Sequence, residues 1–456
     1  MDTTLPPDTN TEIPPLAEGD SPLPGTGQGK KKAAGDSPLP ASGKANKKAD
    51  ATLPASAQAP LLYTVMMLAL MGQMLLNPLI APLSREMGLR EWHIGLTISL
   101  AAIMFALTSG PWGRASQRFG VRPVLTAAMG MGAIALAAFA LLAHFGMKGV
   151  WVGTGLLLGV ILTRGVIYGG AIAALNPTVQ THLVTHTVTE AQRLKAVGGM
   201  GAVTGLSSVV GAMIGGALAA IGGLMLPLTI MPVLMLLGIG MLLWRFQHSK
   251  PLAEMEKPAK LSYFDPRVFP FLVVGLALFT AFAAVGTLFG FIVQDRFGMS
   301  ATAAASFTAL YMVVLSIFLI LAQAVAAPKL GWSSVVLMRR GVLFALAGTV
   351  LLLFASSHWT LTLATILFGF GAGLIMPGYN AGPTIHMSAR EQGSLAGLIH
   401  ANNGMAYAIA PVTFTALYGW DPRYPLAVAA LLLAAAMLFG YLHPKLRELA
   451  SVNRAN

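Results

Sequence analysis

Long apolar stretches recur along most of the chain and constrain its fold more than any other feature of the sequence. From Leu61 onward, each stretch is long enough to cross about 30 Å of hydrocarbon as a helix that rises about 1.5 Å per residue. Membrane-spanning strands would be about 10 residues long and would alternate in polarity, and the sequence has no such alternation. The pattern therefore predicts an all-α membrane protein with twelve transmembrane helices.

The expected spans form two groups of six. The longest connection between spans, residues 247–266, is polar, and the loop sequence Arg118-Phe-Gly-Val-Arg of the first group is echoed by Lys329-Leu-Gly-Trp-Ser in the matching loop of the second. We therefore expect two pseudo-symmetric six-helix bundles, at 60–246 and 267–443, with the linker between them. The expected spans are residues 60–82, 92–112, 122–143, 150–176, 197–222, 224–246, 267–294, 301–327, 335–356, 359–387, 391–418 and 423–443.

Composition excludes several other classes of protein. The chain is 55% hydrophobic and only 10% charged, whereas about a quarter of the residues in a soluble globular protein are charged. It has no cysteine, which excludes disulfides and thiolate metal sites, and it has no Walker-type loop and no His-Glu-x-x-His motif. The glycine-rich run at 369–373 lies inside a span without a preceding strand, so helix packing explains it better than phosphate binding. We expect neither an enzyme nor a metal or other cofactor.

Basic residues are distributed unevenly between the two sides of the membrane. Of 29 Lys and Arg residues, 23 fall in the two tails and the even-numbered loops, 5 fall in the opposite loops, and Arg164 lies inside a span. This asymmetry places both termini in the cytoplasm and explains the net charge of +12 without nucleic acid. Residues 1–59, rich in Pro, Gly, Ser and Lys, are expected to form a disordered cytoplasmic tail, and residues 444–456 a second tail. We expect a monomer embedded in the lipid of a bacterial inner membrane.

A loop signature gives the first indication of a family. The sequence Gly113-Arg-Ala-Ser-Gln-Arg-Phe-Gly-Val-Arg122 resembles the signature Gly-x-x-x-Asp-Arg-x-Gly-Arg-Arg between spans two and three of the major facilitator superfamily. The resemblance implies that Gly113 and Gly120 allow close packing and a tight turn, and that Arg118 and Arg122 hold the loop in the cytoplasm. The family's acidic position, which locks one transport state, is Gln117 here, and an amide forms a weaker lock than a carboxylate.

A second element lies on the expected fifth span. The sequence Gly211-Ala-Met-Ile-Gly-Gly216 resembles the Gly-Pro-x-x-Gly-Gly element of the superfamily's antiporters and drug exporters, with Ala212 in place of proline. The resemblance implies export. Gly211 and Gly215 also share one helical face, so close packing against another span is the structural alternative. Pro411 occupies a similar offset in the second group of spans.

Arg164, near the middle of the expected fourth span, is the most informative single residue. An arginine at that depth costs a few kcal/mol, so we expect it to face a water-filled cavity and to bind an anion. It aligns with the arginine of the family's span-four signature, although Tyr168 stands where that signature has glycine. Tyr168 lies one turn away and is expected to orient the arginine or to stack on a substrate. Pairing of Arg164 with backbone carbonyls or other helices is the structural alternative.

The positions of the carboxylates bear on the substrate. Of the 17 acidic residues, seven lie in the N-terminal tail and the others lie in loops or near span ends, so none is expected at mid-membrane. Exporters of cationic drugs resemble one another in having a buried acidic residue, and this chain departs from them. We expect an anionic or zwitterionic substrate, for example a citrate-type siderophore or a drug-like compound. A proton relay would fall to His400 or Asp295, and a hydrogen-bonded structural role is the alternative for His400.

Further polar residues within the spans are candidate liners of a substrate cavity. Each also has a structural alternative, because polar side chains join membrane helices to one another. They are Gln73 and Asn77 on one face of the first span, Tyr379 and Asn380 on the tenth, and Asn403 near His400 on the eleventh.

Together these features predict a secondary active transporter that exports a small organic molecule by alternating access, coupled to protons that flow inward. Import of an organic anion by proton symport would use Arg164 equally well. A membrane sensor or assembly protein that has lost transport is the alternative from another class, and Gln117 and Ala212 would be the marks of that loss.

Overall fold

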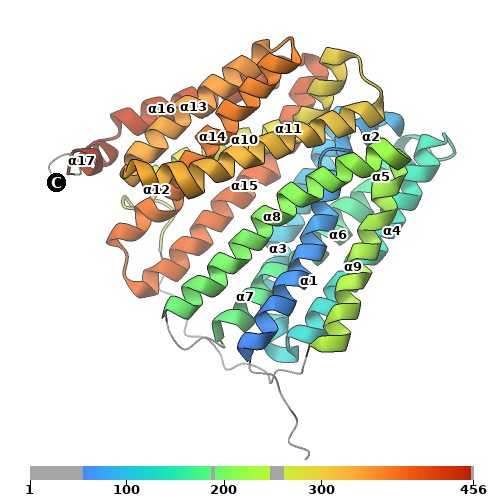
Figure 1. Ribbon diagram of the computed structural model, residues 1–456, viewed down its shortest axis with the longest axis horizontal. Helices are drawn as coiled ribbons and strands as arrows, with labels where there is room; N and C mark the ends of the chain where they lie inside the picture. The colour runs from blue at the N-terminus through green and yellow to red at the C-terminus, as the bar shows by residue number, and fades with distance from the viewer. Residues whose placement is uncertain (1–54, 186–189, 247–260, 453–456) are drawn as a thin grey trace, which may run out of the picture. The chain divides into compact units, whose positions relative to one another are not determined.

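The structure, a computed structural model, describes residues 55–185, 190–246 and 261–452 (Figure 1). Within these ranges the chain forms helices and short connections, and no strand occurs among them, as expected for an all-α membrane protein. Residues 1–54 of the expected tail and residues 247–260 of the expected linker lie outside the described residues.

The long helices coincide with the expected spans. In the described part of the chain, eleven helical segments are long and apolar enough to cross a membrane, and each overlaps one expected span. The remaining expected span is α15, which has 32 residues and carries His400, Asn402 and Asn403 within it. The helices are α1 (Ala55–Leu76), α2 (Ile80–Glu86), α3 (Glu91–Phe119), α4 (Val121–Met147), α5 (Gly153–Val160), the π-helix η1 (Ile161–Ile167), α6 (Tyr168–Ile172), α7 (Leu175–Thr185), α8 (Glu190–Gly222), α9 (Met225–Arg245), α10 (Phe269–Phe297), α11 (Ala301–Leu321), the π-helix η2 (Ala322–Ala326), α12 (Ala327–Leu330), α13 (Ser334–Phe354), α14 (His358–Ala381), the 3₁₀-helix η3 (Gly382–His386), α15 (Ala389–Trp420), α16 (Tyr424–Leu442) and α17 (Pro444–Val452).

The first expected span is interrupted at Asn77, between α1 and α2. Asn77 precedes Pro78, and a proline ring disfavours helical backbone at the residue before it, so α1 ends here. The expectation that Gln73 and Asn77 share one helical face is therefore wrong. Asn77 lies exposed in the connection, where its Nδ2 donates to the Met74 sulfur at 3.1 Å.

Much of the C-terminal segment, expected as a tail at 444–456, forms the helix α17. Leu446 of this helix is buried, and the Arg339 guanidinium of α13 donates to the carbonyls of Gly440 at 2.8 Å and Leu446 at 3.3 Å. Leu446 and Arg339 thus help to hold α17 against α13 and α16.

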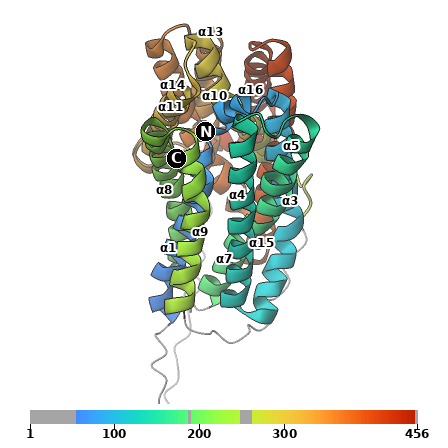
Figure 2. The same cartoon turned by 90° about the vertical axis from the view of Figure 1, so that its right-hand side faces the viewer.

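Two large hydrophobic clusters form the interior. The first is built almost entirely from α1 to α9, and the second almost entirely from α10 to α17. We call residues 55–246 the first half and residues 261–452 the second half. Figure 1 and Figure 2 show α1, α4, α7 and α9 together in the first half, and Figure 1 shows α13 beside α14 and α16 in the second. The expected boundaries of two separate bundles, at 60–246 and 267–443, stay a prediction.

The two halves meet closely where α3 begins and α15 ends, and we call this the closed end. A Cβ atom on Gly95 of α3 would lie 2.4 Å from the Pro411 carbonyl oxygen of α15, so the two backbones touch there. One turn further along α3, the Ser99 hydroxyl oxygen accepts a hydrogen bond from the Val412 backbone N–H at 3.2 Å. Glycine at position 95 is required for this approach, because any side chain would collide with backbone.

The glycines of α8 pack in two directions. A Cβ atom on Gly211 would lie 3.1 Å from a backbone oxygen of α1, in the same half. A Cβ atom on Gly215 would lie 2.4 Å from the Leu75 backbone oxygen, also in α1. The next residue, Gly216, turns toward the second half, where its Cβ would lie 2.2 Å from the Ala309 Cβ of α11. One short element therefore holds the first half together and also forms part of the contact between halves.

Away from the closed end, the same four helices separate, and we call this the open end. Gly205 lies on the same face of α8 as Gly216, about three turns away, yet a Cβ atom there would meet no described atom within 4 Å. On α11, Ile320 is 43% exposed, and on α3 Leu107 is 66% exposed. A Cβ atom on Gly404 of α15 would likewise meet no described neighbour. Among the described residues, the glycine contacts between the halves on α3 and α8 therefore lie at the closed end, whereas Gly205 of α8 and Gly404 of α15 have no close neighbour at the open end.

We predict that Gly215→Ala lowers the melting temperature of the purified protein. The added methyl would overlap the Leu75 carbonyl, and overpacking of this kind costs about 1–3 kcal/mol. The measurement is thermal unfolding in detergent, followed by tryptophan fluorescence.

Gly205→Ala is the matched control on the same helix. Its methyl meets no described atom, and alanine favours a helix over glycine by up to about 1 kcal/mol, so the melting temperature should stay the same or rise. An equal fall in both variants would contradict the contact between Gly215 and α1.

Candidate functional site

Arg164 lies in a π-helical turn, η1, between α5 and α6. A π-helix forms hydrogen bonds over one residue more than an α-helix, so it accommodates an extra residue, and such turns are frequent at functional sites. Tyr168, the first residue of α6, follows this turn directly. Sequence reasoning did not predict the π-helix, although Tyr168 in place of the family's glycine was a signal of it.

The residue that packs most closely on α3 is Gly169. A Cβ atom on Gly169 would lie 2.7 Å from the Ala101 backbone, whereas Gly165 leaves 3.2 Å to the Thr97 carbonyl oxygen. Gly169, one residue after the position expected for the glycine of the span-four signature, thus makes the closer of these two contacts, and it lies two residues after η1.

The carbonyl of Gly170 is satisfied by side chains of α3. Trp112 donates from its indole Nε1 at 2.7 Å, and the Thr108 hydroxyl donates at 3.2 Å. These bonds and the glycine contacts fix the segment from η1 to α6 against α3. Arg164 therefore sits on a rigid support.

The Arg164 side chain is buried, with 6% of its surface exposed, whereas the sequence predicted that it would face a water-filled cavity. Its Cζ lies 4.6 Å from the ring centroid of Tyr168, which is fully buried and forms a cation–π contact. Neither Arg164 Nε nor the Tyr168 hydroxyl has a hydrogen-bond partner among the described residues, and no carboxylate in that part of the chain forms an ion pair with the guanidinium. Leaving a buried charge uncompensated is strongly unfavourable.

A polar network in the second half includes Tyr379 and Asn403. The Tyr379 hydroxyl donates to Asn403 Oδ1 at 2.9 Å and accepts from Asn402 Nδ2 at 3.0 Å, and Asn402 Oδ1 accepts from the Tyr263 hydroxyl at 2.7 Å. Asn402 also donates to the Leu272 carbonyl at 3.1 Å. The network joins the chain before α10 to α14 and α15, and its groups are satisfied by one another.

The other polar candidates lie apart from this network. Asn380 is exposed on α14, and Gln73 is half-buried on α1. His400 is exposed on α15, and its ring makes no hydrogen bond to a described residue. The structure shows no hydrogen bond between His400 and Asn403, which lie three residues apart on one helix.

Asp295, at the end of α10, belongs to a charged cluster that joins the halves at the closed end. Arg85 of α2 donates from Nη2 to Asp295 Oδ2 at 2.9 Å and to Glu91 Oε1 at 2.9 Å, and a second Arg85 nitrogen contacts Asp295 Oδ1. The Tyr418 hydroxyl of α15 donates to Asp295 Oδ2 at 2.8 Å. The guanidinium also lies 5.0 Å from the Phe291 ring centroid. Sequence reasoning identified Asp295 and missed Arg85 and Tyr418, whose partners are far away in the chain.

The loop signature residues lie between α3 and α4. Gly120 has φ of 87°, which allows the sharp reversal between these helices, and Arg122 donates to the Leu243 carbonyl at 2.6 Å, at the end of α9. Arg118 is exposed and lies over the Phe119 ring. Gln117 is half-buried and forms no hydrogen bond to another described residue. The signature thus shapes this loop, and the family's acidic lock has no counterpart bond here.

Gly113, the first residue of the signature, lies at an ordinary packing distance from its neighbour. A Cβ atom on Gly113 would lie 3.6 Å from the Pro177 Cβ of α7. Alanine would therefore be accommodated at this position in the state described.

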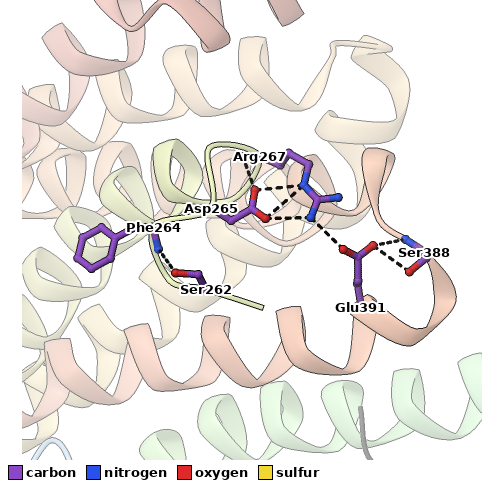
Figure 3. A network of polar contacts seen from close by, with 6 residues as sticks. All are labelled: Ser262, Phe264, Asp265, Arg267, Ser388 and Glu391. Carbon is purple, nitrogen blue, oxygen red and sulfur yellow. Dashed lines mark hydrogen bonds and ion pairs between the residues drawn. The ribbon is translucent and has the colours of Figure 1, made fainter. Parts of the chain in front are cut away.

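A second charged network fixes the start of α10 to the start of α15 (Figure 3). Arg267 donates to Asp265 Oδ2 at 2.8 Å and to Glu391 Oε1 at 2.9 Å, and Glu391 Oε2 accepts from the Ser388 hydroxyl at 2.8 Å. Hydrogen bonds from the Arg267 guanidinium hold the pKa of Asp265 below its usual range. All four residues belong to the second half, so this network does not bridge the halves.

The described residues contain no group of three or more histidine and acidic side chains placed to hold a metal ion. The arrangement places a buried guanidinium, Arg164, within the first half and a charged cluster around Asp295 at the closed end.

Comparisons with known proteins agree with this architecture. The sequence model of the Major Facilitator Superfamily matches residues 62–411. Tetracycline resistance protein class B of Escherichia coli is 25% identical over 398 residues, which are 82% of this chain and 94% of that protein. The class C protein of Escherichia coli is 29% identical over 344 residues, which are 72% of this chain and 80% of that protein.

Solved structures share the fold. A bacterial homolog of the human lysosomal transporter Spinster, in an inward-facing and occupied conformation, has a TM-score of 0.66 at 14% identity and covers 85% of this chain and 96% of its own. A human organic anion transporter has a TM-score of 0.58 at 16% identity and covers 85% of this chain and 99% of its own. The helical architecture and the match over residues 62–411 show that the chain belongs to the Major Facilitator Superfamily of membrane transporters.

Proposed function

We propose that this transporter exports a small anionic or zwitterionic organic molecule by alternating access, in exchange for protons. The observation that carries the proposal is that α3, α8, α11 and α15 touch at one end and separate toward the other. Two halves that meet in this way can expose a site between them to one side of the membrane at a time.

The direction of export is supported by two observations. The named relatives are tetracycline resistance proteins, and the α8 element resembles that of exporters. The distribution of Lys and Arg predicts that the open end faces the cytoplasm, because α3 begins on the side that has few basic residues. We therefore interpret the described state as inward-open, ready to take substrate from the cytoplasm.

The charge of the substrate follows from Arg164. The guanidinium is buried without a carboxylate partner among the described residues, so an anionic group would relieve an unfavourable buried charge, whereas a cation would add to it. Tetracycline-like zwitterions and organic acids, including carboxylate siderophores, belong to the class that this site would accept.

Proton coupling is assigned to the cluster around Asp295. Its carboxylate bridges the halves through Arg85 and also accepts from Tyr418. Protonation would remove the negative charge that holds Arg85 and would weaken the closed end.

Transport into everted membrane vesicles tests the function. With an imposed proton gradient, vesicles that contain the protein should accumulate tetracycline or benzoate and not the cation tetraphenylphosphonium, and a protonophore should abolish the accumulation. Uptake of the same probes into intact cells would favour the anion importer instead. Absence of flux for every probe would favour a sensor that has lost transport.

We predict that Arg164→Ala abolishes transport of the anionic probe, by at least about tenfold, while the protein still inserts into the membrane. The change removes the charge that would neutralise the substrate. Arg423→Ala, in an exposed arginine of the loop before α16, is the control and should leave transport unchanged. Normal benzoate flux in Arg164→Ala would exclude Arg164 from the binding site.

We also predict that Asp295→Asn, which imitates the protonated carboxylate, shifts the protein away from the state with a closed outer end. The chain has no cysteine, so Gly205→Cys alone gives a single thiol at the open end that a water-soluble maleimide should reach. In the Asp295→Asn background the labelling rate should fall up to about fivefold, as expected for loss of a partly exposed ion pair. Asp421→Asn is the control, because the Asp421 carboxylate accepts a hydrogen bond from the nearby Arg423 backbone N–H. Equal labelling in both backgrounds would show that Asp295 does not hold the closed end.

A further inference from the structure

Two buried polar atoms lie on neighbouring turns with no partner in the described part of the chain: Arg164 Nε and the Tyr168 hydroxyl. Arg164 is 6% exposed and Tyr168 is fully buried. Both atoms are hydrogen-bond donors, and a tyrosine hydroxyl can also accept. Because a buried polar group without a partner costs about 1–3 kcal/mol, two such donors side by side need an explanation.

Other polar groups beside Arg164 and Tyr168 are satisfied within the protein. The neighbouring Gly170 carbonyl receives two hydrogen bonds from α3, and the Thr163 hydroxyl donates to the Gly159 carbonyl at 2.7 Å. The two donors stand out because they belong to side chains that contact each other.

The π-helical turn explains how these two donors come together. In the family signature a glycine stands four residues after the arginine, and here the glycine that packs on α3 is Gly169, five residues after Arg164. The additional residue is accommodated by η1, and the position that it creates is filled by Tyr168, whose ring lies against the guanidinium. In this arrangement Tyr168 places an aromatic ring and a hydroxyl donor beside the arginine, while Gly169 keeps the close contact with α3.

We propose that Arg164 Nε and the Tyr168 hydroxyl donate to the two oxygens of one carboxylate of the substrate, which makes Tyr168 a specificity-determining residue. The inference rests on the proposed function and adds to it the chemical group that is recognised. A carboxylate has two acceptor oxygens and a negative charge, whereas the corresponding amide has one acceptor oxygen and an NH₂ group that would face a donor. The pair therefore selects carboxylates over amides of the same shape.

The support of the pair is rigid and close to the contact between halves. The turn that carries Arg164 packs on α3, one of the four helices that join the halves, through Gly165 and Gly169. A movement of α3 during transport would therefore also move Arg164 and Tyr168. Binding of a carboxylate is in this way linked to the state of the transporter.

The test is ligand-induced stabilisation of the purified full-length protein, measured by tryptophan fluorescence, with benzoate against benzamide and salicylate against salicylamide. The parent protein should bind each acid at least about tenfold more tightly than its amide. Tyr168→Phe keeps the ring and the cation–π contact and removes only the hydroxyl, so affinity for the acids should fall about tenfold while that for the amides stays the same. Unchanged preference in Tyr168→Phe would overturn the proposal.

Tyr311→Phe is the matched control. Tyr311 is a buried tyrosine of the second half, and its hydroxyl lies 2.8 Å from His358 Nδ1, so it has a partner within the protein. This variant should keep the preference for acids even if its melting temperature falls. Loss of preference in both variants would point to a general loss of packing and would overturn the proposal.

Inorganic phosphate and sulfate test whether the pair binds a carboxylate of the substrate or a free inorganic oxyanion. If either ion stabilised the protein as well as benzoate and competed with it, the pair would be a site for inorganic oxyanions and the proposal would be wrong.

Flux in everted vesicles distinguishes a failure of this inference from a failure of the proposed function. If the parent protein exports tetracycline but Tyr168→Phe keeps the preference for acids, the inference is wrong and the proposed function stands. If Tyr168→Phe loses the preference for acids but the parent protein transports no probe, the proposed function is wrong and the inference stands.

Discussion

Close approach of helix backbones at glycine is the interaction on which this fold depends. Lipid is as apolar as a leucine side chain, so helices in a membrane gain little from burying apolar surface and associate through tight packing instead. Within the first half, Gly169 meets Ala101 and Gly215 meets Leu75 at backbone distances, and within the second half Gly371 of α14 would place a Cβ 2.3 Å from the Ala345 nitrogen of α13. The same kind of contact recurs between the halves at Gly95. One type of packing therefore builds the bundles and also closes the interface.

Satisfaction of polar groups is the second constraint, because hydrocarbon offers no water to bond with. Where the helices are interrupted or end inside the protein, a side chain supplies the missing bond. Ser99 receives the Val412 N–H beside Pro411, and Arg296 donates to three carbonyls at the end of α13, among them Leu352 at 2.6 Å. In this setting the unpartnered donors of Arg164 and Tyr168 indicate a ligand more strongly than burial alone would.

The spans could be predicted from the sequence because length and apolar composition decide them locally. The arginine of the fourth span was found for the same reason, since a charge in an apolar run is conspicuous. Two features depended on geometry that no local pattern determines: the π-helical turn packs on α3, and the pair of Arg85 and Asp295 joins residues about two hundred positions apart. The end of α1, in contrast, follows from a local signal that the prediction did not use, the proline after Asn77.

The contacts that join the halves differ in kind from those that hold each half together, and this difference is what a switching protein requires. The side chains of Arg85 and Asp295 are 25% and 37% exposed, so their ion pair contributes about 1 kcal/mol at most. The contacts at Gly95 and Gly216 let the helices approach closely but bury little apolar surface, because glycine has no side chain. Each half, in contrast, has its own continuous hydrophobic cluster. Separation at the closed end would therefore leave most of each cluster in place, which would allow a second state, and under the proposed function a change of charge at Asp295 would shift the populations of the two states.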